Sequence, residues 1–175
     1  RKKAKKSDSL EINRARQVIN YCLEIAKKLK INQEEQEILR VAAQLRDIGE
    51  MDIPQDIFFK PGRLTYFERK TVELHPVQGA EMIRQIEPLK KAKEVVRHHH
   101  ERFDGTGYPD GLEKEKIPLL SRIIACVDAY DAMTSERPYR RRKFSPGEAL
   151  EEIKNNSGSQ FDPQIARIFA KIVEK

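Results

Sequence analysis

The chain has 175 residues, of which 38% are hydrophobic and 35% are charged. This length is enough for one domain with a sizeable core, and no apolar run is long enough to cross a membrane. The net charge of +6 does not indicate a DNA partner, because no helix-turn-helix or zinc-finger signature accompanies it. Cys22 and Cys126 lie within apolar helical patterns, which favours buried thiols over a disulfide or a reactive site.

The beginning of the chain is rich in lysine and arginine, and we interpret residues 1–9 as a basic linker from an upstream region. Residues 10–175 are expected to form a single domain. Because the chain starts at Arg1 and carries no signal-peptide pattern, we expect a cytoplasmic domain of a longer protein. Formation of a homodimer through the amino-terminal helices is left open.

Apolar and small residues recur at helical spacing in the first half of the chain, and capping signals mark where some helices begin. Proline and glycine at Pro54 and Pro61-Gly62 indicate a connecting loop. The predicted helices are residues 15–29, a helix from the cap Asn32 with Glu35 to Gly49, a short helix from the cap Thr65 with Glu68 to His75, and helices at about 77–86 and 89–100.

The second half begins with a glycine-containing loop that runs to Pro118, and a largely buried helix is expected at about 123–133. Two further helices each open with a cap followed by a proline, at Ser145-Pro146 and at Asp162-Pro163. No segment alternates between apolar and polar residues as a strand would. The sequence therefore predicts an all-α domain of about seven or eight helices.

Three of the four histidines lie side by side at 98–100, where a helix is expected to end. A helical bundle builds metal sites from side chains that project inward from several helices, and aspartates on an apolar helix face are costly to bury unless they are paired or bind metal. Carboxylate with imidazole suits iron, manganese or zinc, and a bridging carboxylate suits a two-metal centre that activates water against phosphate esters. The candidate ligands are Asp47, His75, His99, His100 and Asp128.

Each candidate also has a purely structural interpretation. His75, before a proline, could simply end a helix, and Asp128 with Asp131 could be a hydrogen-bonded pair. The basic residues around Arg137 and Arg140 could hold phosphate oxygens through forked guanidinium contacts or form a solvated face. The joint pattern of the candidates favours the metal site.

A series of short motifs follows in order along the chain, from about residue 18 to 163. The motifs are Arg46-Asp47-Ile48-Gly49-Glu50, Lys60-Pro61-Gly62-Arg63-Leu64-Thr65 with Glu68, His75-Pro76 with Gly79, His99-His100-Glu101-Arg102 with Asp104-Gly105 and Gly107-Tyr108-Pro109, Arg122-Ile123, Asp128-Ala129-Tyr130-Asp131-Ala132 and Arg137-Pro138-Tyr139-Arg140. Together they resemble the HD-GYP family, a branch of the HD superfamily of metal-dependent phosphohydrolases. The resemblance implies an HD-domain-like helical bundle and hydrolysis of the cyclic dinucleotide c-di-GMP at a centre of two or three metals, in intracellular signalling proteins.

The resemblance also implies roles for individual residues. Asp47 would bridge metals and is the catalytic candidate, whereas Asp128 would belong to the neighbouring metal position. His75, His99 and His100 match the histidines of one metal position. The residues implied in ligand binding are Gly105, Gly107, Tyr108, Pro109, Asp131, Arg137 and Arg140, with the two arginines on the ligand phosphates.

Three positions on one side of the site depart from the family pattern. The histidine of the HD pair is Arg46, whose guanidinium cannot ligate a metal. The lysine that normally follows is Glu50, which either turns to the metal or pairs with Arg46. A further histidine, expected near Asn13 and Arg14, is absent. The retained residues are enough for one divalent metal (iron, manganese or zinc) rather than two or three, and losing one metal should cost much of the hydrolytic rate.

Three functions follow from these departures. We favour a c-di-GMP signalling domain with impaired or lost phosphodiesterase activity, which binds c-di-GMP or a partner protein such as a diguanylate cyclase domain. The alternative is an active metal-dependent phosphodiesterase, with Glu50 as a ligand, that hydrolyses c-di-GMP to pGpG or GMP. In the third, no metal or nucleotide binds, and Arg46 neutralises Asp47 and Glu50 in a salt-bridge cluster.

Overall fold

The computed structural model describes residues 2–135 and 142–174, with side chains from residue 12 onward. Over these residues the predicted all-α fold is confirmed, and isolated β-bridges stand in place of strands. The helices are α1 (Lys2–Lys28), α2 (Gln33–Leu45), α3 (Gln55–Phe58), α4 (Tyr66–Val72), α5 (His75–Ile83), α6 (Lys93–Arg97), α7 (Leu119–Thr134), α8 (Pro146–Asn155) and α9 (Pro163–Val173), with 3₁₀ turns η1 (Ile48–Asp52), η2 (Lys90–Ala92) and η3 (Lys114–Lys116). In the described part of the chain no helix has both the length and the apolar character needed to cross a bilayer.

The side-chain caps predicted from the sequence are present. Thr65 accepts the Glu68 N–H while the Glu68 carboxylate accepts the Thr65 N–H, and Ser145 with Glu148 forms the same reciprocal pair. Asn32 caps α2. These caps depend on residues only a few positions apart, so local sequence is enough to place them.

Several predicted helices have different bounds in the structure, and the first helix and the helix predicted at 89–100 differ most. The first helix extends back to Lys2, so residues 2–9 of the predicted basic linker are helical. The helix predicted at 89–100 is replaced by η2 and the short α6, and residues 98–100 form a turn. A physical reason is that the His99 imidazole donates to the Val96 carbonyl oxygen at 2.6 Å, which is the acceptor that a continuing helix would offer to residue 100.

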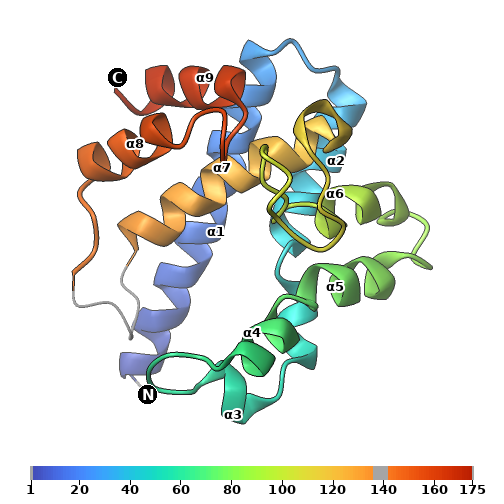
Figure 1. The fold of residues 1–175 in the computed structure, drawn as a ribbon, viewed down its shortest axis with the longest axis vertical. Coiled ribbons are helices and arrows are strands. Elements are labelled where there is room, and N and C mark those ends of the chain that lie inside the picture. Colours follow the sequence, from blue (N-terminus) through green and yellow to red (C-terminus); the bar gives the residue numbers. More distant parts are fainter. Residues whose placement is uncertain (1, 136–141, 175) are drawn as a thin grey trace.

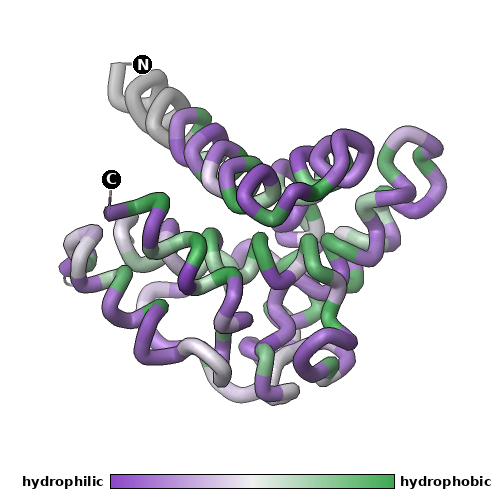
Figure 2. Tube along the Cα trace, turned by 90° about the horizontal axis from the view of Figure 1, so that it is seen from above, coloured by the Kyte–Doolittle hydropathy of each residue, from purple (hydrophilic) through white to green (hydrophobic). Residues whose placement is uncertain are grey.

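The core forms where α1, α7 and α9 pack together (Figure 1). Tyr21 of α1 makes edge-to-face contacts with Tyr130 of α7 and Phe169 of α9, at ring-centroid distances of 6.0 and 5.4 Å. Figure 2 shows α1 running along one side of the domain. Cys22 and Cys126 are free thiols buried in this core, as predicted, and burial raises the pKa of Cys22 to about 12.

The segment that follows the candidate ligand Asp47 is fixed by a close backbone contact between η1 and α5. A Cβ atom built on Gly49 would lie 2.0 Å from the carbonyl oxygen of His75 and 2.6 Å from the backbone nitrogen of Gly79. No side chain fits there, so glycine is required for the two segments to touch. This contact places Asp47, two residues earlier, beside His75.

We therefore expect Gly49→Ala to lower the free energy of unfolding by roughly 1–3 kcal/mol, as overpacking does in a tight interior contact. Urea denaturation followed by circular dichroism measures the change. Gly147→Ala is the matched control, because a Cβ there meets nothing within 4 Å and should leave stability nearly unchanged. Equal stability of the two variants would contradict the role assigned to Gly49.

Candidate metal centre and ligand pocket

Four potential metal ligands converge from three segments of the chain. Asp47 lies between α2 and η1, His75 is the first residue of α5, and His99 and His100 follow α6. One ligand atom from each lies within 4.8 Å of the other three. These are four of the five predicted ligands. The fifth, Asp128 of α7, is engaged with an arginine instead.

The imidazoles of this group are oriented by the backbone. His75 Nδ1 lies 2.8 Å from the Val72 carbonyl oxygen, and His99 Nδ1 lies 2.6 Å from that of Val96. A carbonyl oxygen only accepts, so both Nδ1 atoms carry the proton and, in the neutral rings, both Nε2 lone pairs face the centre of the group. The two Nε2 atoms are 3.4 Å apart, and each is 3.8 Å from Asp47 Oδ1. Such facing lone pairs repel one another unless a cation lies between them.

The surroundings favour the neutral, ligating form of the histidines. Burial lowers the pKa of His99 to about 4. Burial, together with the neighbouring His99, lowers the pKa of His100 to about 3. Desolvation raises the pKa of Asp47, and Arg46 opposes this shift. At neutral pH, protons therefore do not compete with a metal for His99 or His100.

These residues fit one divalent metal ion. Metal–nitrogen bonds of about 2.0–2.1 Å in a tetrahedral site put ligand atoms roughly 3.3 Å apart. The 3.4 Å between the Nε2 atoms of His75 and His99 agrees with that spacing. Each of these histidines also donates its other ring N–H to a backbone carbonyl, the second contact that metal-bound histidines usually make. Three imidazoles and one carboxylate suit zinc, iron or manganese.

The Arg46 guanidinium occupies the space beside this group. Its Nε donates to Asp128 Oδ1 at 2.7 Å, one terminal nitrogen lies 3.2 Å from Asp47 Oδ2, and the other donates to the Ala43 carbonyl at 2.8 Å. The ion pair with Asp128 raises the pKa of Arg46 against the effect of burial. Desolvation alone would raise the pKa of Asp128, but Arg46 and the histidines hold it below its usual value. A fixed cation, which cannot itself ligate a metal, therefore bridges the two carboxylates.

A second arginine neutralises the next aspartate along α7. Arg14 of α1 donates to Asp131 Oδ2 at 2.7 Å, and Ser135 donates to the other oxygen at 3.2 Å. Asp128 and Asp131 therefore pair with two different arginines in this structure, rather than with each other as the structural interpretation of the sequence proposed. Arg14 lies where the resemblance led us to expect a histidine.

A family model described as HD domain matches residues 2–165. The chain belongs to this family. A cyclic di-GMP phosphodiesterase of Pseudomonas aeruginosa is 46% identical over 136 residues, which cover 76% of this chain and 32% of that protein. The cyclic di-GMP phosphodiesterase response regulator RpfG of Xanthomonas campestris is 39% identical over 142 residues, which cover 80% of this chain and 37% of that protein. The resemblance to the HD-GYP branch is thus confirmed, although the chain spans only about a third of the length of these curated relatives.

Solved structures support the fold of this HD domain. An HD-GYP-type protein of Bdellovibrio bacteriovorus superposes with a TM-score of 0.73 at 18% identity, covering 93% of this chain and 52% of that one. A cyclic GMP-AMP specific phosphodiesterase of Vibrio cholerae superposes with a TM-score of 0.67 at 22% identity, covering 90% of this chain and 44% of that one. At these identities the likeness concerns the fold alone.

The glycine-rich loop of the HD domain packs directly on the metal ligands. Tyr108 stacks on His100 with ring centroids 5.0 Å apart. A Cβ on Gly107 would lie 2.2 Å from the backbone nitrogen of Arg102, and Gly105 has a φ of +80°, so both predicted glycines are required by the backbone. Pro109 follows Tyr108 through a cis peptide bond. In the structure this loop supports the candidate metal ligand His100, and its predicted contact with a nucleotide stays a prediction.

Sequence reasoning missed the residues that hold this loop in place. The Glu101 carboxylate accepts the backbone N–H groups of Asp110 at 2.8 Å and Leu112 at 3.2 Å. The Asp110 carboxylate lies 2.9 Å from His98 Nε2. It also accepts hydrogen bonds from two nitrogens of the Arg97 guanidinium, each at 2.8 Å. His98, Glu101 and Asp110 lie close enough to hold a metal, but their atoms already form this clamp. Only the adjacency of Glu101 to the paired histidines marked it in the sequence.

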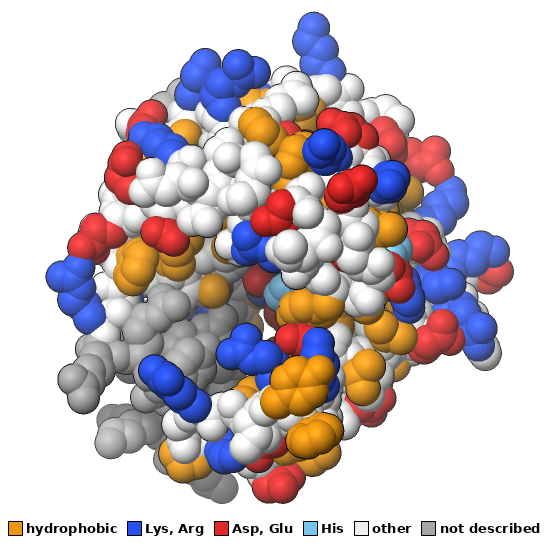
Figure 3. All heavy atoms as spheres, in the orientation of Figure 1, with side chains coloured by type: hydrophobic (Ala, Val, Ile, Leu, Met, Phe, Trp, Pro, Cys, Tyr) orange, Lys and Arg blue, Asp and Glu red, His pale blue; other side chains and the backbone are white. Residues whose placement is uncertain are grey.

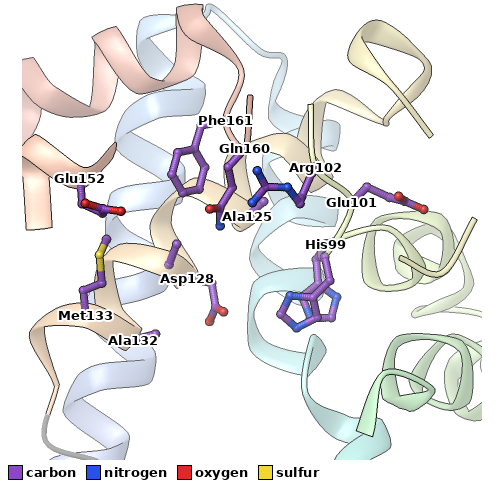
Figure 4. Close-up of a pocket in the computed structure, with 12 residues that line it drawn as sticks. His99, Glu101, Arg102, Ala125, Asp128, Ala132, Met133, Glu152, Gln160 and Phe161 are labelled. Carbon is purple, nitrogen blue, oxygen red and sulfur yellow. The ribbon is translucent and has the colours of Figure 1, made fainter. Parts of the chain in front are cut away.

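A cavity of about 340 Å³ opens beside His100 and Asp128 (Figure 4). Figure 3 shows a hollow near the middle of this face, with a histidine side chain at its base. The residues that line the cavity are His99, His100, Glu101, Arg102, Ala125, Asp128, Ala129, Ala132, Met133, Glu152, Gln160 and Phe161. The residues from α8 and the following turn were not predicted, because no local pattern marks them. The predicted phosphate contacts Arg137 and Arg140 lie outside the described residues.

In the presence of a chelator, the HD domain should lose stability as the pH falls from about 6.5 towards 4. The pKa of His99 is about 4 in the folded state against an ordinary 6.5, so the unfolded chain takes up the proton first. The contribution is fully present above about pH 6.5 and is lost as the pH falls towards the folded pKa.

Urea unfolding at a series of pH values measures this dependence. The slope for the wild type should exceed that of His99→Gln by up to about 1.4 kcal/mol per pH unit, the value for one proton. If both proteins showed the same slope between pH 6 and 4.5, the neutral, buried state assigned to His99 would be wrong.

Proposed function

We propose that this HD-GYP domain binds c-di-GMP with a single metal position and that its phosphodiesterase activity is impaired or lost. The observation that carries the proposal is the Arg46 guanidinium, which bonds to Asp128 and lies against Asp47, the two carboxylates assigned to the second metal. The similarity to cyclic di-GMP phosphodiesterases supports the ligand. The second binding function that we propose is the binding of a partner protein, such as a diguanylate cyclase domain.

Within this proposal, His75, His99, His100 and Asp47 hold the metal, which would supply a Lewis acid to polarise a phosphate oxygen. The backbone carbonyls of Val72 and Val96 keep the Nε2 atoms directed at it. Arg46 contributes a fixed positive charge but offers no lone pair, so it cannot activate a water molecule. The chain's own residues are thus equipped to bind a phosphodiester better than to cleave it.

The alternative function is an active phosphodiesterase that hydrolyses c-di-GMP to pGpG or GMP. It is favoured by the names of the relatives, one of which is 46% identical to this chain. This function requires a ligand in place of the missing histidine, and Glu50 is the nearest candidate in sequence. Among the described residues, Glu50 is not part of the four-residue ligand group.

Metal content tests the proposal directly. After reconstitution with manganese, zinc or ferrous iron, the wild type should hold about one equivalent, because only one position retains its ligands. Arg46→His should raise the content towards two by adding an imidazole between Asp47 and Asp128. Arg46→Lys is the control, which keeps the cation and should stay at one. Two or more equivalents in the wild type would favour the active enzyme, and none would favour the salt-bridge cluster without metal.

Turnover of c-di-GMP separates binding from catalysis. With manganese or ferrous iron the wild type should release linear pGpG far below the roughly 1–1,000 s⁻¹ of ordinary enzymes. The double variant Arg46→His, Glu50→Lys restores the family residues at both positions and should raise the rate at least about tenfold, equivalent to about 1.4 kcal/mol of barrier. Adding His99→Ala to the double variant should abolish that gain. Ordinary turnover by the wild type would refute the proposed loss of activity.

A further inference from the structure

Exposed aromatic side chains gather on the hairpin formed by α3, α4 and the loop between them. Among the described residues nine large hydrophobic side chains are exposed, and six of these lie between positions 51 and 74. Four of the six are aromatic, namely Phe58, Phe59, Tyr66 and Phe67, and the most open, Phe67, is 81% exposed. None of the four belongs to the candidate metal ligands or lines the cavity. We call these four rings the aromatic hairpin surface.

An ion pair holds the two halves of the hairpin together. Lys60 directly follows Phe59, and Glu68 directly follows Phe67. The Lys60 ammonium lies 2.7 Å from each oxygen of the Glu68 carboxylate, which brings the two pairs of rings to the same end of the hairpin. Within each neighbouring pair the rings meet edge to face, with centroids 5.0 and 5.6 Å apart. A surface that is already ordered loses less conformational entropy when a partner binds.

The hairpin is placed where a partner can reach it. Figure 1 shows α3 and α4 at the lower end of the domain, and Figure 3 shows hydrophobic side chains at the surface in this region, below the hollow. Met51 and Leu74 are also exposed. They lie at the base of the hairpin, because η1 leads into α3 and α4 leads into α5. The apolar character therefore extends from the rings towards the base.

The area of the aromatic hairpin surface is that of an interface. At about 150–250 Å² for a whole aromatic side chain, the four rings together expose roughly 500 Å². The largest apolar patch of a typical monomer is about 300–600 Å² and is often functional. A standard protein–protein interface buries about 800 Å² on each partner. The rings, with Met51, Leu74 and a polar rim, supply that area without another part of the domain.

The charges around the rings indicate what kind of partner fits. The acidic residues between positions 51 and 74 are Asp52, Asp56, Glu68 and Glu73, and the basic residues are Lys60, Arg63, Arg69 and Lys70. Lys60 pairs with Glu68 and Lys70 with Glu73. The other four, two of each sign, are exposed and make no ion pair with another described residue.

This segment therefore has no net charge, although the whole chain carries +6. Anionic lipid headgroups attract clusters of excess lysine and arginine, which the hairpin lacks. A two-fold contact between identical surfaces instead brings residue i of one copy against residue j of the other and requires both signs on each. The balance of charge favours a second copy of the chain over a membrane.

We propose that the aromatic hairpin surface is a self-association interface, at which the hairpins of two copies pack ring against ring about a two-fold axis. The exposed aspartates of one copy then pair with the exposed arginines of the other. This contact lies on α3 and α4, not on the amino-terminal helix. It goes beyond the proposed function, because neither metal nor c-di-GMP takes part in it.

Sedimentation velocity of the full chain, in the presence of a chelator, tests the interface. The wild type should pass from monomer to dimer as its concentration rises into the high micromolar range. The double variant Phe59→Ser, Phe67→Ser should raise the dissociation constant at least about tenfold, since large aromatic anchors carry most of the energy of an interface. Ile12→Ser on α1 and Ile86→Ser after α5 are the matched controls, because both side chains are exposed but lie outside the hairpin.

Three results of this experiment would overturn the proposal. The wild type could remain monomeric, or the double variant could associate as the wild type does while circular dichroism shows that both are folded. Loss of association in Ile12→Ser alone would place the contact on α1 instead. If the wild type stays monomeric but floats with phosphatidylserine vesicles, and the double variant does not, the surface belongs to a membrane.

Charge exchange tests the two-fold arrangement separately. An acidic variant, Arg63→Glu with Arg69→Glu, and a basic variant, Asp52→Lys with Asp56→Lys, should each stay monomeric, because like charges meet across the axis. An equimolar mixture of the two should associate again. If each variant alone dimerises like the wild type, or the mixture does not associate, the arrangement is wrong. None of these outcomes depends on metal content or turnover, so the proposed function is tested independently.

Discussion

The contact on which the rest of the site depends is the ion pair between Arg46 and Asp128. It joins the end of α2 to α7 across 82 positions of sequence, at the point where Asp47, His75 and the histidines that follow α6 also meet. The Asp128 carboxylate is largely shielded from solvent and needs a cation beside it to stay ionised. A metal ion would meet this need in an HD domain that keeps its histidine, and here a guanidinium meets it instead. The domain therefore stabilises this part of its centre without requiring a bound ion.

The same interaction shapes the surroundings of the site. Because Arg46 fixes Asp128, the face of α7 that also carries Ala129 and Ala132 is held at a defined distance from the histidines, and the cavity opens between them. Arg14 repeats the arrangement one turn further along α7, where it anchors α1 to Asp131. The two arginines thus tie the long first helix and the second helix to the helix that lines the pocket. The candidate metal ligands His75, His99 and His100 lie on one side of Arg46, and the arginine–aspartate pairs lie on the other.

The parts that the sequence predicted correctly are those that local pattern or ordered motifs determine. The caps at Thr65 and Ser145 need only residues three positions apart, and the converging ligands followed from the motifs. The predicted end of the helix at 89–100 was wrong because the His99 imidazole donates to the Val96 carbonyl oxygen. The spacing of apolar residues does not reveal such a side-chain contact. The pairing of Arg46 with Asp128 was also not predicted, since only the fold brings them together. Glu152 and Gln160 were missed because each is an ordinary polar residue until α8 lies beside α7.

In the proposed function, the charge at the centre should couple the metal to the nucleotide. Asp47, Asp128 and Asp131 carry three negative charges and Arg14 and Arg46 carry two positive ones, so these five groups together have one net negative charge. With neutral histidines, nothing in this set attracts a phosphodiester. A divalent ion on Asp47 and the histidines reverses the sign and leaves one net positive charge, which matches the single negative charge of one phosphodiester group. Metal binding and nucleotide binding should therefore be positively coupled in this domain, and, by thermodynamic reciprocity, nucleotide should tighten the metal by the same factor.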